Sequence, residues 1–67
     1  NTTNNLLSTD FVKSELDKAS KLKENEKYQE AIDVYDNILK YDNQNYESIV
    51  YKADCFIFIS IFLVYLL

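Results

Sequence analysis

Residues 26–42, EKYQEAIDVYDNILKYD, constrain the fold more than any other part of the chain. Polar residues fill most positions of this stretch, and its apolar residues recur at the spacing of one face of an α-helix. These are Tyr28, Ala31, Ile32, Tyr35, Ile38 and Leu39. A single helix with one apolar face must bury that face against other structure. The segments before and after this stretch are therefore expected to pack against it.

Length and composition limit the kind of protein that this chain can form. With 67 residues it makes at most one small domain, and a core of this size rarely supplies more than about 3–5 kcal/mol of net stability. Cys55 is the only cysteine and histidine is absent, which argues against an intrachain disulfide and a transition-metal cage. The net charge of −4 argues against binding to nucleic acid. Without histidine or glycine, neither a catalytic triad nor a phosphate loop is expected, so we predict no enzyme and no cofactor.

A helix is predicted on each side of the central stretch. Residues 1–9 read as a flexible leader, and a first helix is expected from about Asp10 to Glu24. Asn25 is the residue best suited to the turn that follows this first helix, because asparagine takes the left-handed conformation easily. Asn45 suits the cap of a third helix that begins near Tyr46 or Glu47. The apolar residues expected to face inward on this third helix are Ile49, Val50, Ala53, Phe56 and Ile57.

One short sequence pattern occurs twice in the chain. Lys18-Ala19-x-x-Leu22 and Lys52-Ala53-x-x-Phe56 share one pattern, and their alanines are 53 − 19 = 34 residues apart. This is the period of the tetratricopeptide repeat, a helix–turn–helix unit. Further residues continue the resemblance to that family, with Tyr28 at the aromatic that opens the second helix and Ala31 and Tyr35 at its A-x-x-x-F element.

The resemblance covers about residues 13–56, which is one repeat and the first helix of a second. It implies that Ala19 and Ala31 lie where two helices approach closely. The chain departs from the family at four positions, where the family usually has Trp, Leu, Gly and Pro; these are Glu15, Lys18, Glu26 and Asn43.

The resemblance also implies a binding groove. In the family, the first helices of the repeats line a concave surface that holds extended peptides or helices of partner proteins. The corresponding positions in this sequence are Lys13, Leu16, Ser20, Lys23, Glu47, Val50 and Asp54. Solvated helix faces explain the same residues equally well. Leu16 and Ser20 replace the Lys and Asn with which some members hold acidic C-termini, so a carboxylate clamp is not expected.

The last thirteen residues, CFIFISIFLVYLL, are almost entirely apolar. As a helix they would span about 20 Å, less than the roughly 30 Å of a bilayer core, and Lys52 and Asp54 oppose an extension backwards. Three interpretations remain open: a helix covered by a partner chain, a truncated or partly inserted membrane tail, and an error in the gene model. The residues expected to be buried by a partner or membrane are Phe58, Ile61, Phe62 and Tyr65.

The sequence thus predicts an all-α fold: a tetratricopeptide-like antiparallel hairpin and a third helix within residues 10–56, then an apolar segment over residues 57–67. The expected function is a non-catalytic protein–protein interaction module in the cytoplasm, as a fragment or small subunit of a larger assembly. Its expected partners are other protein chains. The alternative is a small tail-anchored protein that displays one repeat on the cytoplasmic face of an organelle membrane.

Overall fold

The computed structural model describes the backbone of residues 2–67 and the side chains of residues 10–67. The chain forms three α-helices, α1 (Thr2–Glu24), α2 (Tyr28–Tyr41) and α3 (Tyr46–Leu66), and no strand occurs over this range. The predicted all-α class is therefore confirmed.

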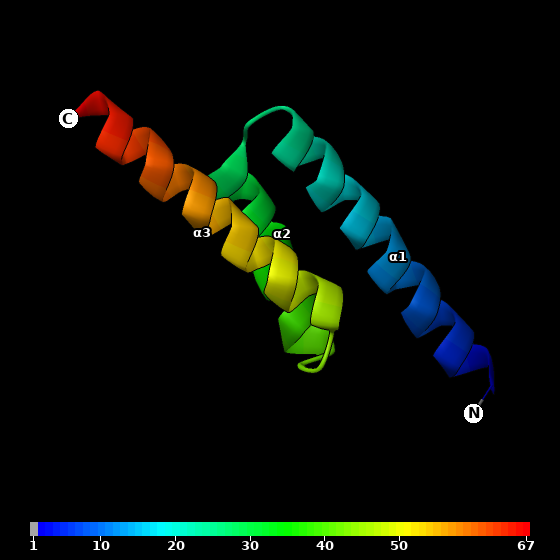
Figure 1. Ribbon diagram of the computed structural model, residues 1–67. Helices are drawn as coiled ribbons and strands as arrows, with labels where there is room; N and C mark the ends of the chain where they lie inside the picture. The colour runs from blue at the N-terminus through cyan, green and yellow to red at the C-terminus, as the bar shows by residue number, and fades with distance from the viewer. Residues whose placement is uncertain (1) are drawn as a thin grey trace.

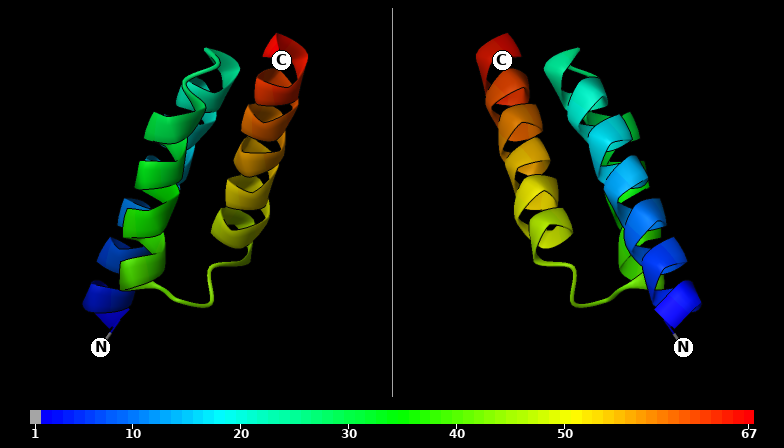
Figure 2. Two further views of the ribbon diagram at one scale, coloured as in Figure 1. Left: turned by 90° about the vertical axis from the view of Figure 1, so that its left-hand side faces the viewer. Right: turned by 90° about the vertical axis from the view of Figure 1, so that its right-hand side faces the viewer.

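The three helices form an elongated molecule in which α2 packs against both of the others (Figures 1 and 2). α2 runs antiparallel to α1 and to α3, so α1 and α3 point in the same direction. The principal extents are 52 × 20 × 13 Å. Because α2 has neighbours on two sides, it needs more apolar surface than a helix with one.

The core follows from this position of α2. Five of its residues are buried, together with one residue of α1 and Cys55 of α3. Ala19 and Ala31 are both fully buried where α1 and α2 pack, and their small side chains allow close approach of the two helices. Val34 is buried although it lies outside the predicted stripe, because α2 presents a second face to α3. The buried hydrophobic residues are Ala19, Ala31, Ile32, Val34, Tyr35, Ile38 and Cys55.

The first helix begins earlier than the sequence suggested. α1 starts at Thr2, whereas a leader was expected over residues 1–9 and a helix only from about Asp10. No glycine or proline occurs in the chain to stop a helix from extending backwards. Asn1 lies outside the residues that the structure describes.

The turn between α1 and α2 uses a different residue from the one expected. Glu26, not Asn25, has a left-handed backbone, with φ of 62°. Its amide donates to the carbonyl of Lys23 at 3.0 Å, and the amide of Lys27 donates to that of Leu22 at 2.8 Å. This pair of bonds is the Schellman arrangement, which places its left-handed residue just after the helix. Asn25 instead donates from Nδ2 to the carbonyl of Lys21 at 3.0 Å.

The third helix begins at Tyr46 with Asn45 as its cap, as predicted, and crosses residue 56 without a break. The face that it turns to α2 differs from the prediction. Ile49, Val50, Ala53, Phe56 and Ile57 are exposed, and the buried or half-buried face carries Ser48, Lys52, Cys55 and Ile59.

Interactions with α2 account for this orientation of α3. The apolar residues of α3 surround most of the helix, so hydrophobicity alone does not select a side. Small Ser48 and Cys55 permit close packing, and Lys52 forms an ion pair with Asp36. Aromatic contacts complete the interface, with Phe58 stacked on Tyr28 at 5.3 Å and Tyr51 beside Tyr35 at 6.2 Å between ring centroids.

Candidate binding groove

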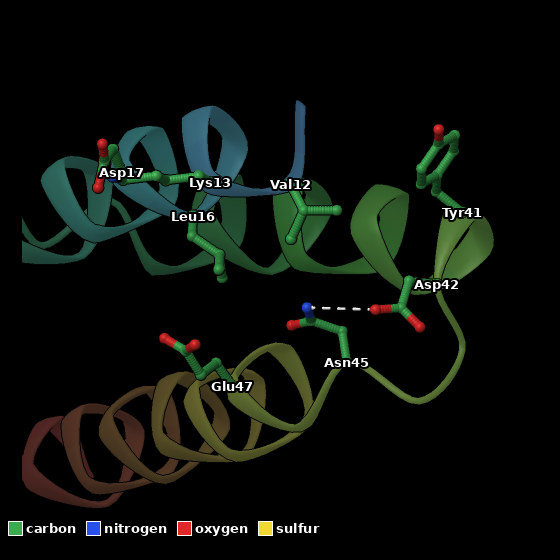
Figure 3. Close-up of a pocket in the computed structure, with 8 residues that line it drawn as sticks. All are labelled: Val12, Lys13, Leu16, Asp17, Tyr41, Asp42, Asn45 and Glu47. Atoms are coloured by element: carbon green, nitrogen blue, oxygen red, sulfur yellow. Dashed lines mark hydrogen bonds between the residues drawn. The ribbon is translucent and has the colours of Figure 1, made fainter. Parts of the chain in front are cut away.

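A groove of about 850 Å³ lies between the middle of α1 and the start of α3, with the end of α2 at its base (Figure 3). Val12 and Leu16 of α1 point toward α3, and Glu47 points back toward them. The full lining is Val12, Lys13, Leu16, Asp17, Tyr41, Asp42, Asn45 and Glu47. We call this the α1–α3 groove.

The loop at the base of the groove is held by the side chains of Asp42 and Asn45, of which Asn45 caps α3. Asn45 Nδ2 donates to Asp42 Oδ2 at 3.5 Å, as Figure 3 shows, and the amide of Gln44 donates to Asp42 Oδ1 at 3.2 Å. Asn45 Oδ1 accepts from Ser48. This part of the groove is thus fixed by hydrogen bonds as well as by packing.

A narrower extension of about 250 Å³ continues between α1 and α3 toward the middle of the molecule. Its lining is Leu16, Asp17, Ser20, Lys23, Tyr35, Glu47 and Tyr51. Lys23 closes the gap between the two helices here, since its Nζ lies 4.0 Å from Asp54 Oδ2 and 4.5 Å from the ring centroid of Tyr51. The ammonium group therefore has both a charged and an aromatic partner on α3.

The structure brings together six of the seven residues predicted for the groove. Five line the groove or its extension: Lys13, Leu16, Ser20, Lys23 and Glu47. Asp54 joins them through Lys23. Val50 does not, because it lies on the exposed side of α3, which turns away from α2.

Several lining residues were not predicted for the groove. Tyr51 is the clearest, since it lies one helical turn after Glu47 and so shares its face of α3. Asp17 follows Lys13 in the same way on α1. Tyr35 had been assigned only to the core, yet it also reaches the groove extension from α2. Helical spacing could have identified Tyr51 and Asp17 as lining residues, whereas the contribution of Tyr35 depends on the depth of the groove.

Two titratable groups near the groove extension are shifted toward their neutral forms. Burial, supported by the nearby acidic groups of Cys55, Tyr51, Asp54 and Glu47, raises the pKa of Tyr35 to about 12. Burial also raises the pKa of the Cys55 thiol, against an opposing effect of Lys23. Cys55 is a free, buried cysteine, and its thiol is poorly suited to act as a nucleophile. Over the part of the chain that the structure describes, no group of three or more His, Cys, Asp or Glu side chains is placed to hold a metal ion.

The predicted tail residues have two kinds of environment. Phe58 stacks on Tyr28, and Phe62 lines a second hollow of about 480 Å³ with Leu63, Ile59 and Tyr28. Ile61 and Tyr65 are 59% and 89% exposed. They belong to an apolar end of α3 that projects beyond the packed part of the molecule (Figure 1).

By length and composition alone, α3 can cross a membrane. It is the one such helix found among the described residues, with 21 residues and only 6% of its most apolar window buried. At 1.5 Å per residue its length is about 32 Å, close to the thickness of a bilayer core. Lys52 and Asp54 lie within it, however, and both form ion pairs with the other helices.

Comparisons of the chain with protein-family models, curated proteins and solved structures find no match.

Proposed function

We propose that this protein is a non-catalytic interaction module, which binds a peptide or helix of a partner protein in the α1–α3 groove. The observation that carries the proposal is the groove itself. It is open to solvent, it combines apolar Val12 and Leu16 with charged Lys13, Asp17 and Glu47, and hydrogen bonds fix its base. Apolar surface supplies affinity in such sites, and a few placed polar groups supply orientation.

The proposal includes a tetratricopeptide-type hairpin. Two features support it beyond the period of 34 residues. Ala19 and Ala31, at the family's small positions, are fully buried where α1 and α2 meet. Glu26, at the position where the family has glycine, has φ of 62°, in the region that favours glycine. A left-handed residue at this position is compatible with the turn for which the family uses glycine, and so supports the proposal.

The uncovered side of α3 supports a role within a larger assembly, which we propose lies in the cytoplasm. α2 packs against both α1 and α3, but α3 has packed structure on one side only. In a repeat array the next helix would cover its free side, because each repeat buries its apolar face against a neighbour. A partner subunit can provide the same cover.

The groove can be tested by selecting peptides from a random phage-displayed library on the full chain, kept in a mild nonionic detergent. We expect enriched peptides to bind at least tenfold more weakly to the double variant Lys13→Glu, Glu47→Lys. These charges line the groove, and exchanging them keeps the net charge constant.

The matched control is the double variant Asp33→Lys, Lys40→Glu, which reverses two exposed charges on the outer face of α2. It should bind the selected peptides as the unchanged protein does. Selection of no peptide, or equal binding by both double variants, would rule out the groove as the binding site.

The second candidate function is a tail-anchored module that displays the hairpin at a membrane. The apolar, exposed end of α3 favours it. Alkaline carbonate extraction of cells that express the tagged chain distinguishes the two candidates. An anchored chain stays in the membrane pellet, and release into the soluble fraction excludes the anchor.

A further inference from the structure

The exposed side of α3 carries a continuous stripe of uncharged residues. Its members alternate in spacing between four and three positions, which places them on one face of the helix. All of them are exposed, on the side opposite to Ser48, Cys55 and Ile59, which face α2. They are Tyr46, Val50, Ala53, Ile57, Ser60, Val64 and Leu67. We call this set the outer stripe.

An alternation of three and four residues is the heptad pattern by which two helices pack side by side. The stripe consists of two interleaved series, each with a spacing of seven residues. The first series is β-branched throughout: Val50, Ile57 and Val64. The second series runs from Tyr46 to Leu67 and has small residues at its centre, Ala53 and Ser60, which allow the two backbones to approach. Branched side chains of one helix can therefore fit over small residues of a second helix with the same sequence.

We propose that the outer stripe is the contact face of a symmetric dimer, in which α3 of one copy packs along α3 of a second copy. In a twofold dimer the same patch serves on both sides. A patch that contains both the branched and the small side chains is complementary to itself. This face is separate from the α1–α3 groove, and the proposal does not depend on what binds there.

The charges of α3 leave the outer stripe free for this contact. Lys52 pairs with Asp36 of α2, and Asp54 lies near Lys23 of α1. Glu47 is the third charged residue of α3, and none of the three belongs to the stripe. The line of contact between two stripes is therefore free of charge, with Glu47 and Asp54 at its edge, where they keep their water. The stripe also offers no charge for a partner of opposite charge to recognise, which favours a second, equally neutral stripe.

The available area is sufficient for a dimer. The large side chains of the outer stripe, with the neighbouring Ile49, Phe56 and Ile61, are 43% to 105% exposed. With roughly 60–120 Å² for a fully exposed aliphatic side chain and roughly 150–250 Å² for an aromatic one, they offer on the order of 600 Å² per copy. Two copies would bury about 1,200 Å², the lower end of stable interfaces.

The test compares two substitutions to glutamate at similarly exposed positions of α3. Ile57, in the stripe, is 55% exposed, and Phe62, which lies seven residues after Cys55 on the opposite side of the helix, is 61% exposed. The mass of the full chain is measured by sedimentation equilibrium in a mild nonionic detergent over a range of concentrations. We expect dimers for the unchanged chain and for Phe62→Glu. For Ile57→Glu we expect a dissociation constant raised at least tenfold, with helicity unchanged by circular dichroism.

A second pair repeats the comparison near the end of the helix, with Val64→Glu in the stripe and Leu66→Glu outside it, at 70% and 66% exposure. An unchanged chain that stays monomeric at all concentrations would overturn the proposal. If that monomeric chain also floats with phosphatidylcholine vesicles, the stripe contacts lipid and not a second copy. Equal weakening by both members of a pair would also overturn it, because general apolarity and not the stripe would then drive association.

Discussion

Asn45 Oδ1 accepts two hydrogen bonds from Ser48, one from its backbone amide at 2.9 Å and one from its hydroxyl at 2.6 Å. One side-chain oxygen thus caps the first turn of α3 and also satisfies the hydroxyl of a fully buried serine. Both bonds fix the point at which the chain leaves the base of the groove. The loss of this oxygen should therefore cost more than the loss of an ordinary cap.

We expect Asn45→Ala to lower the free energy of unfolding by about 1–2 kcal/mol, because a cap is lost and a buried hydroxyl loses its acceptor. Urea unfolding followed by circular dichroism measures the effect. Asn43→Ala is the control, since Asn43 is exposed in the same loop, and it should change the free energy by less than about 0.5 kcal/mol. Equal effects would show that Asn45 is not the cap in solution.

A substitution at Ile38 tests whether this face of α2 forms the core. It is fully buried, whereas Ile49 on α3 is about half exposed. Ile38→Val should lower the free energy of unfolding by about 0.5–1.5 kcal/mol through the loss of one methylene group and its contacts. Ile49→Val should have little effect. Thermal melts of the two variants in the same buffer compare them directly, and a larger loss for Ile49→Val would contradict the orientation of α3.

Glu26→Gly should stabilise the protein. A residue other than glycine in the left-handed region costs about 1–2 kcal/mol, and glycine offsets part of that gain through the flexibility of the unfolded chain. We expect a net gain of up to about 1 kcal/mol in urea unfolding. Asn25→Gly, one residue earlier, should destabilise, since Glu26 is the one residue in the described chain with positive φ and Asn25 bonds to Lys21. A loss of stability in Glu26→Gly would contradict the turn.

The raised pKa of Tyr35 predicts that the folded protein loses stability in alkali. Its pKa is raised from 10.0 to about 12 in the folded protein, so above pH 10 the unfolded chain releases this proton more readily. The stabilisation is complete below pH 10 and is lost as the pH rises toward 12. Urea unfolding between pH 9 and 12 should show a decline that is shallower in Tyr35→Phe. An absorbance titration at about 295 nm should also lose a component near pH 12 in that variant. Identical pH profiles would exclude the role of Tyr35.

The ion pair between Lys23 and Asp54 should contribute little by itself. Both side chains are partly exposed, and such pairs are worth about 0–1 kcal/mol. A double-mutant cycle with Lys23→Met and Asp54→Asn measures the coupling, which should decrease in high salt. A coupling well above about 1 kcal/mol, insensitive to salt, would instead make Lys23 the main link between α1 and α3.

The helices that the sequence predicted best are those with one clear apolar face. The stripe from Tyr28 to Leu39 predicted α2 and most of its buried residues, and Asn45 predicted the start of α3. The side of α3 that faces α2 could not be predicted, because its apolar residues surround the helix. Small Ser48 and the pairing of Lys52 with Asp36 decide it, and both are tertiary effects. For the same reason the sequence could not show that Val50 lies on the exposed side of α3, outside the lining of the groove.

The position of α2 between its two neighbours has a consequence for how the chain folds. The main interfaces join helices that follow each other directly in sequence, so each requires the closure of only a short loop and can form rapidly. Either hairpin can form first and serve as the template on which the remaining helix docks. In the reverse direction, α1 or α3 can detach while the other hairpin persists. The amide hydrogens of α2 should therefore exchange with solvent last, only when both partners have left.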